Sequence, residues 1–283
     1  MKCIFLNERE TSLSKVYSQK LVKELQLTEE NIALGTIQKL MMLCSHPRLV
    51  TKQATHSAKA ADLMREAPKL AWTITQLKAI RRQKEKAIIF TRYIAMQAML
   101  RQAIFEEFHI NAQIINGSVK GSRVQMIREF SQTPGFDVMI LSPRAAGVGL
   151  NIVAANHVIH YSREWNPAVE NQATDRAYRI GQTKPVHVYY PIMEGEQFET
   201  VEERLDILLR EKRELMRSVI IPTDLEIQAE AFYDLLNYKN IYFVPMKQDD
   251  HINKPRSVVA DFSQTQGAIE SALDGRQVQP VFW

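Results

Sequence analysis

Between residues 69 and 193, short apolar runs alternate with longer segments of helical periodicity. The apolar runs have the length of buried strands and cover 87–90, 112–116, 138–141, 157–161 and 186–192. Segments with apolar residues along one helical face cover 70–80, 94–108 and 123–131. Strands that alternate with helices favour a parallel sheet with helices on both faces. We therefore predict an α/β fold for residues 69–193.

The residues before this region have a mainly helical pattern. A short apolar run, Cys3–Leu6, is followed by helical periodicity over 13–25 and again over 32–44. The second pattern ends at Pro47, because proline cannot continue a helix. We expect residues 1–68 to form a helical segment.

The residues after this region divide at Pro222. Over 194–221, apolar residues keep three- and four-residue steps, and the other positions are mostly Glu, Arg and Lys. This pattern predicts one long exposed helix with a single apolar seam. Residues 222–283 are polar and irregular, and their pattern indicates no function.

The composition indicates the cellular compartment more clearly than it indicates a binding partner. The 36 Lys and Arg residues exceed the 32 Asp and Glu residues slightly, so the net charge of +4 permits contact with a polyanion without requiring it. Cys3 and Cys44 are too few for a disulfide framework and lack metal-ligand neighbours. No apolar stretch approaches the ~18 residues of a membrane span. We expect an intracellular protein in a reducing compartment, with no membrane contact and no metal site of its own.

The stretch 165–182, WNPAVENQATDRAYRIGQ, has the signals of a helix with a basic face. Asn166 is a good N-cap, Pro167 suits the first helical position, and Gly181 suits a left-handed stop. Three polar side chains follow i, i+4, i+7 spacing and would share one face: Gln172, Arg176 and Arg179. Two guanidinium groups and an amide that point the same way favour phosphate binding.

This stretch also permits a purely structural interpretation. Exposed arginines at helical spacing commonly form a solvated face, or they pair with nearby carboxylates such as Glu170 and Asp175. Trp165 would then be a core residue at the end of a strand.

The loop 142–151, SPRAAGVGLN, directly follows a predicted strand. Ligands bind at the carboxyl ends of strands in open α/β sheets, and this loop must lie there. Gly147 and Gly149 would let the backbone approach a ligand, while Arg144 and Asn151 supply polar groups. The alternative is a tight connection between a strand and a helix.

Several motifs of self-sufficient enzymes are absent from the sequence. There is no Gly-Lys pair, hence no phosphate loop, and no Asp-Glu pair to hold Mg²⁺. HExxH, CxxC and GxSxG are also missing. The chain therefore offers cations for a phosphate without the groups that cradle a nucleotide or activate a nucleophile.

Five stretches, in this order, closely resemble the C-terminal half of Swi/Snf-family DNA translocases, which are superfamily-two helicase-like ATPases. They are IQKLMMLCSHPRLV, AIIFTRY, INGSVKGSRVQMIREF, LSPRAAGVGLNI and VIHYSREWNPAVENQATDRAYRIGQTKPVHVY. The resemblance covers about residues 2–219, and DRAYRIGQ is its most specific part.

The resemblance implies a second RecA-like lobe, with 1–68 leading to a missing first lobe, 69–193 forming the lobe itself and 194–221 acting as a brace helix. ATP and Mg²⁺ would bind only with the first lobe present. The implied partners are double-stranded DNA, the N-terminal RecA-like lobe and a DNA-bound protein substrate. The compartment would be the cytoplasm or nucleoid of a bacterium, or the nucleus of a eukaryote.

The resemblance also implies roles for individual residues. It makes Arg176 and Arg179 catalytic arginine fingers. The residues expected to contact the nucleotide are Gln172, Asp175, Gly147 and Gly149. Those expected to contact DNA are Thr91, Arg92, Gly117, Ser118, Ser142, Arg144, Asn151 and Trp165.

The sequence departs from the family pattern at three places. Ala146 replaces the usual glycine, Asn116 the usual aspartate, and Ala67-Pro68-Lys69 the usual Ser-Gly-Lys. A degenerate lobe that binds DNA or protein without catalysis is therefore the main alternative. A Rossmann-type enzyme is a weaker one, because GxGxxG does not follow the first strand.

Overall fold

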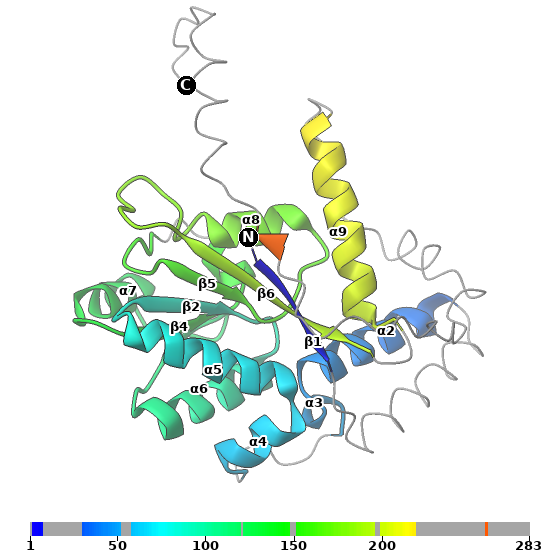
Figure 1. Cartoon of the computed structure of the whole chain (residues 1–283), viewed down its shortest axis with the longest axis horizontal. Helices are drawn as coiled ribbons and strands as arrows, with labels where there is room; N and C mark the ends of the chain where they lie inside the picture. Colours follow the sequence, from blue (N-terminus) through cyan, green and yellow to red (C-terminus); the bar gives the residue numbers. More distant parts are fainter. Residues whose placement is uncertain are drawn as a thin grey trace, which may run out of the picture.

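A computed structural model of the chain describes residues 2–7, 30–51, 58–119, 121–147, 151–195, 199–218 and 258–259 (Figure 1). Its strands are β1 (Lys2–Asn7), β2 (Lys86–Phe90), β3 (Gln113–Ile115), β4 (Asp137–Leu141), β5 (His157–His160), β6 (His187–Glu194) and β7 (Val258–Val259). Its helices are α2 (Glu30–Ser45), α3 (Arg48–Thr51), α4 (Ala60–Glu66), α5 (Pro68–Arg82), α6 (Ile94–Phe108), α7 (Arg123–Gln132), the 3₁₀ turn η1 (Arg144–Gly147), α8 (Pro167–Thr174) and α9 (Val201–Ser218).

The described strands form one sheet in the order β3-β4-β2-β5-β6-β1-β7. All neighbouring pairs are parallel except β1 with β7, which is antiparallel. Each connection between parallel strands must return from the carboxyl end of one strand to the amino end of the next. It therefore runs over one face of the sheet, where its helix lies. The predicted parallel α/β sheet is confirmed.

Side chains of the central strand alternate between two apolar cores. Ala87 and Ile89 of β2 pack into the core formed with α4, α5 and α6. Ile88 and Phe90 pack into the core formed with α7 and α8. Helices therefore cover both faces of the sheet, as Figure 1 shows for α5 and α6 on one side and α8 on the other. Every residue of β2 is buried, which explains the uninterrupted apolar run that follows Lys86 at its start.

The N-terminal segment departs from its helical prediction. The apolar run Cys3–Leu6 lies in β1, which pairs in parallel with β6 over its whole length. A run this short has no helical or strand period long enough to separate the two states. The predicted helix at 13–25 lies outside the described residues, whereas the one at 32–44 is confirmed as α2. In the segment 222–283, only the two residues of β7 are described.

Helix α9 is confirmed as a long helix, but its predicted exposure with a single apolar seam is wrong. Val201, Leu205 and Leu208, which belong to the predicted apolar seam, pack with α2. Two acidic side chains of α9 are also buried, Glu202 with 0% and Asp206 with 1% of its surface exposed. Their burial is possible because cations from other elements meet them, as described below. No helix of the described residues has the length and apolar character needed to cross a membrane.

Candidate functional site

The predicted polar residues gather at the carboxyl edge of the sheet. Thr91 follows β2, Gly117 and Ser118 lie just beyond β3, and Ser142 follows β4. Backbone hydrogen bonds join these segments, because Thr91 N–H donates to Leu141 O at 3.0 Å and Ser142 N–H donates to Ile115 O at 2.9 Å. Residues far apart in sequence thus form one continuous edge.

Thr91 was predicted to contact DNA, but it lies beneath the surface and supports this edge from below. Its side chain has no exposed area, and Ser162 Oγ donates to its hydroxyl at 3.0 Å. The Ser162 hydroxyl in turn accepts from Arg92 N–H at 3.0 Å. The Arg92 guanidinium lies 3.6 Å from the Glu164 carboxylate. Burial raises the pKa of Glu164, and the positive charge of Arg92 opposes that rise.

Asn116, where the family has aspartate, uses both halves of its amide. Its Nδ2 donates to Gln97 Oε1 at 2.8 Å, and its Oδ1 accepts from Ser118 N–H at 3.0 Å and from Ser118 Oγ at 2.7 Å. A carboxylate could accept both bonds from Ser118 but could not donate to Gln97. The amide therefore fixes the turn that exposes Gly117 and Ser118.

The loop after β4 presents one exposed cation and one exposed amide. Arg144 begins η1 and is exposed, and Asn151 is exposed at the far end of the loop. Gly147 is the last residue of η1, and Gly149 lies outside the described residues. The structure thus places Arg144 and Asn151 at the surface and Ser142 partly below it.

Helix α8 begins as predicted and ends early. Asn166 Oδ1 accepts from Ala168 N–H at 2.8 Å, and Pro167 occupies the first turn. The helix stops at Thr174, so the predicted single helical face for Gln172, Arg176 and Arg179 is wrong. Both arginines instead lie in the segment 175–182, which we call the arginine turn.

The arginine turn is bonded to another loop at the point where it leaves the helix. Arg176 O accepts from Ile152 N–H at 2.9 Å, a bond that a continuing helix would have made with residue 180. Gln182 Nε2 donates to Val153 O at 3.0 Å and to Ala155 O at 2.9 Å. Gly181 has a φ of 102°, which a side chain would disfavour. The arginine turn and the loop after β4 are therefore joined.

The two arginines of this turn are available to a ligand. Arg176 Nε is buried, and no described residue offers it a hydrogen-bond acceptor. Arg179 is exposed, and among the described carboxylates none forms an ion pair with either arginine. The alternative that they pair with Glu170 is wrong, because Glu170 binds Arg163 and Arg213. Burial raises the pKa of Asp175, and the charge of Arg176 opposes that rise.

Trp165 contacts an apolar cluster between two helices. It is half-buried against a cluster formed by residues of α2 and α9, whose members include Met41 and Leu205. This packing supports the alternative that Trp165 has a structural role at the strand end.

Buried ion pairs behind the arginine turn were missed by the sequence analysis. Arg163 and Glu170 have no exposed surface, and Lys69 is equally buried against Glu202. Burial alone would raise the pKa of Glu170, but the Arg163 guanidinium outweighs it and holds that pKa below its ordinary value. A signal was present in α9, because Glu202, Asp206 and Arg213 recur at helical spacing beside the apolar seam.

Comparison with known proteins agrees with this geometry. Residues 69–181 match the model of the helicase conserved C-terminal domain. Zorya protein ZorD of Escherichia coli O139:H28 is 42% identical over 197 residues, which are 67% of this chain and 18% of ZorD.

Two solved structures extend the match. The Sulfolobus solfataricus SWI2/SNF2 ATPase core in complex with double-stranded DNA is 28% identical with a TM-score of 0.60, over 82% of this chain and 50% of that one. The C-terminal domain of the Sulfolobus solfataricus SWI2/SNF2 ATPase is 25% identical with a TM-score of 0.59, over 82% of this chain and 96% of that domain. The chain contains the helicase C-terminal lobe of the Swi/Snf family.

The family match confirms the predicted RecA-like fold. The match also covers the candidate site, because residues 69–181 include every segment of the carboxyl edge and most of the arginine turn. The chain spans about a fifth of ZorD and half of the matched ATPase core. It thus corresponds to one part of these larger proteins.

Proposed function

We propose that this chain is the second lobe of an ATP-driven motor that translocates on double-stranded DNA and remodels protein–DNA complexes. The observation that carries the proposal is the arginine turn. It presents two guanidinium groups without carboxylate partners among the described residues, in a chain that has no phosphate loop. Guanidinium groups that lack a carboxylate partner among the described residues of the lobe can bind an anion that comes from outside it.

The residues at the carboxyl edge have the chemistry to bind a nucleotide that lies between this lobe and another one. The unpaired, buried Nε of Arg176 needs an acceptor, and a phosphate oxygen has that chemistry. ATP with Mg²⁺ supplies the transferable phosphoryl group. Arg176 and Arg179 would stabilise the negative charge that develops on this group, and Gln172, Asp175, Gly147 and Gly149 would contact the nucleotide. The first lobe must hold the nucleotide, so this chain alone neither binds ATP tightly nor hydrolyses it.

The loops at the carboxyl edge fit the backbone of DNA. Gly117 and Ser118 are exposed with free approach to the main chain, and Arg144 and Asn151 are exposed on the neighbouring loop. Ser142 and Arg92 belong to the same edge, and Thr91 supports it from below. Trp165, which packs between α2 and α9, would reach DNA only through its partly exposed side. Contacts of this kind reach phosphates rather than base edges, so binding would not depend on sequence. The Sulfolobus ATPase core to which this chain is similar is in complex with double-stranded DNA, which supports DNA as a partner of the lobe.

The proposal is tested by comparing this chain with the protein in which it follows its first lobe. We expect DNA-stimulated ATP hydrolysis from the two-lobe protein and none from this chain. An upstream segment with a phosphate loop and an Asp-Glu pair is required. DNA binding by a two-lobe protein that never hydrolyses ATP would instead establish the non-catalytic binding module.

A further inference from the structure

Five charged side chains between α8 and α9 form one group, which we call the charge cluster. It comprises Arg163, Glu170, Asp206, Arg210 and Arg213. Three of these side chains are buried, whereas the Arg213 and Arg210 side chains are 14% and 37% exposed. Arg163 precedes α8, Glu170 lies within α8, and the other three belong to α9. The charge cluster therefore connects two helices that are far apart in sequence.

Arg163 is the centre of the charge cluster. Its Nε and Nη2 donate to Glu170 Oε1 and Oε2 at 2.8 and 3.2 Å, and its Nη1 donates to Asp206. From α9, Arg213 Nη2 donates to Glu170 Oε2 at 2.6 Å, and Arg210 Nη2 lies 2.5 Å from Asp206 Oδ2. Each carboxylate is thus paired with two guanidinium groups. Glu170 of α8 is joined directly to Arg213 of α9, and both are joined through Arg163 to Asp206 of α9.

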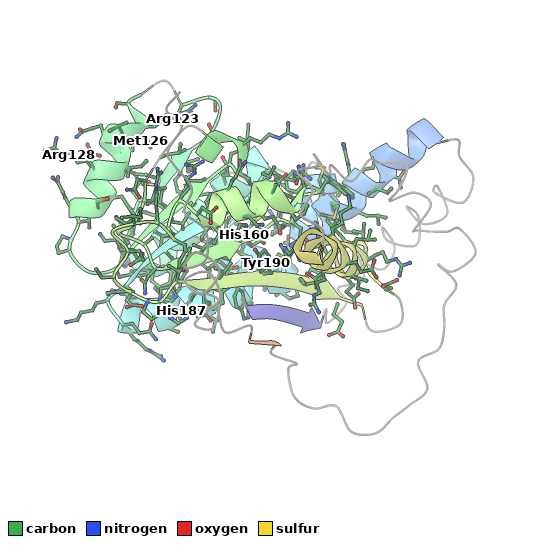
Figure 2. All side chains as sticks on the ribbon, turned by 90° about the horizontal axis from the view of Figure 1, so that it is seen from above. Arg123, Met126, Arg128, His160, His187 and Tyr190 are labelled. Carbon is green, nitrogen blue, oxygen red and sulfur yellow. The ribbon has the colours of Figure 1, made fainter. Side chains whose placement is uncertain are left out.

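An aromatic stack continues from the charge cluster to the last turn of α8. The Tyr190 ring lies 4.5 Å from Arg163 Cζ and stacks on His160 at 4.8 Å. His160 Nε2 is 2.8 Å from the hydroxyl of Thr174, the residue at which α8 ends and the arginine turn begins. Figure 2 shows His160 and Tyr190 in the layer between α8 and β6, with α9 beside them.

We propose that the charge cluster makes α9 a control element for the arginine turn. Buried carboxylates cannot lose their guanidinium partners without a large desolvation penalty, so α8 must follow when α9 shifts. Because α8 leads directly into 175–182, a shift of α9 moves Arg176 and Arg179. Arg213 and Glu170 are thus positioning residues. This inference rests on the proposed function only for its effect on catalysis.

A second ion pair holds α9 without touching α8, and it supplies the matched control. Lys69 Nζ lies 2.5 Å from both oxygens of Glu202, and Glu202 Oε2 also accepts from Met193 N–H at 3.0 Å. This pair fixes the start of α9 to α5 and β6. Removing it loosens α9 but leaves the charge cluster intact.

The decisive variants are Arg213→Met and the double change Lys69→Met with Glu202→Gln. Arg213→Met keeps the aliphatic stem and leaves Glu170 paired with Arg163, so the lobe should fold. In the two-lobe protein we expect kcat to fall on the order of 10- to 100-fold, the size of effect that follows from a catalytic group displaced by about 1 Å. The KM for ATP and the Kd for DNA should stay within about twofold. Arg213→Lys should recover part of kcat. The double variant should lower Tm and keep kcat within about twofold.

A second measurement on this chain alone is independent of catalysis. Amide hydrogen exchange over 175–182 should accelerate in Arg213→Met and stay unchanged in the double variant. Equal exchange in both variants, or a kcat that falls only in step with Tm in both, would overturn the inference. A two-lobe protein without ATPase activity would refute the proposed function, and the exchange measurement would still decide whether α9 controls the arginine turn.

Discussion

Lys69 Nζ and the Glu202 carboxylate form an ion pair from which water is excluded, with distances of 2.5 Å to each oxygen and no exposed surface on either side chain. The two residues come from the first turns of α5 and α9. Lys69 stands in the segment where the sequence departs from the family pattern, so the retained lysine has a structural partner within the lobe.

Removing one member of this pair should destabilise the lobe strongly. Lys69→Met leaves the Glu202 carboxylate buried without its cation, which costs about 3–5 kcal/mol. Urea unfolding of the chain would measure the loss. The control is Lys78→Met, which removes the exposed pair with Glu107 and should cost less than about 1 kcal/mol. Similar losses in the two variants would contradict the burial argument.

Substitution of either arginine in the turn should abolish catalysis and spare the fold. Arg176→Ala and Arg179→Ala remove charge that stabilises phosphoryl transfer, and such groups are worth on the order of 10³–10⁵ in rate. DNA-stimulated ATPase assays of the two-lobe protein measure the effect, and thermal unfolding checks the fold. Arg128→Ala, on the exposed face of α7, is the control. Full activity in both arginine-turn variants would rule out their role as fingers.

Acid should destabilise the lobe before its carboxylates are protonated. Burial lowers the pKa of His46 and of His160 to about 4, and it lowers the pKa of His157 as well. Unfolded histidine titrates near 6.5, so the unfolded chain binds more protons between these values, and stability falls as the pH drops from 6.5 towards 4.

His46 and His160 each contribute up to about 1.4 kcal/mol per pH unit within that window. Urea unfolding at pH 7.5, 6.5 and 5.5 should show the decline, and the stability of His46→Asn should depend less on pH. A flat profile above pH 5 would show that these imidazoles are not kept neutral by burial.

Gln182 should be intolerant of a carboxylate. Its Nε2 donates to the carbonyls of Val153 and Ala155, and Gln182→Glu would place oxygens against oxygens. We expect a loss of about 1–3 kcal/mol, together with faster proteolysis of the loop after β4. Gln132→Glu, at the exposed end of α7, provides the same chemical change as a control. Equal stability of the two variants would contradict the role of Gln182 in joining the segments.

Arg144 should contribute to DNA affinity through charge alone. Arg144→Ala should weaken binding to duplexes of any sequence and reduce the slope of log K against log salt by about 1. Fluorescence anisotropy of the two-lobe protein across a salt series gives the slope. Arg101→Ala, on the exposed face of α6, should leave the slope unchanged. A loss of affinity confined to one DNA sequence would argue against a phosphate contact.

The alternation of short apolar runs and helical periods was enough to predict the sheet and the helices on both faces, because buried parallel strands have a distinctive sequence. It was not enough for β1, since Cys3–Leu6 gains its strand partner from β6, almost 190 residues away. The sequence also did not predict where α8 ends. Asn166 and Pro167 determine where that helix starts locally, whereas its early stop depends on Ile152 and Gln182.

The candidate edge could be located from the sequence because loops after parallel strands must converge. The charge cluster could be located only in part. Helical spacing places Glu202, Asp206 and Arg213 beside the apolar seam of α9, but these residues have the same sequence pattern whether they face water or other charged residues. Only the packing of α9 against α8 turns Asp206 into a buried group.

The placement of Arg176 and Arg179 in a turn has a consequence for how they engage a nucleotide. Arg176 is half-buried and its carbonyl is held by Ile152, whereas Arg179 is exposed. The first arginine is preorganised, and the second must give up about 2 kcal/mol of rotamer entropy when it binds. Arg176 can therefore define where the phosphate sits, and Arg179 can adapt to it as the lobes close. If both arginines were fixed on one rigid helix, one could not define the phosphate position while the other adapts to it.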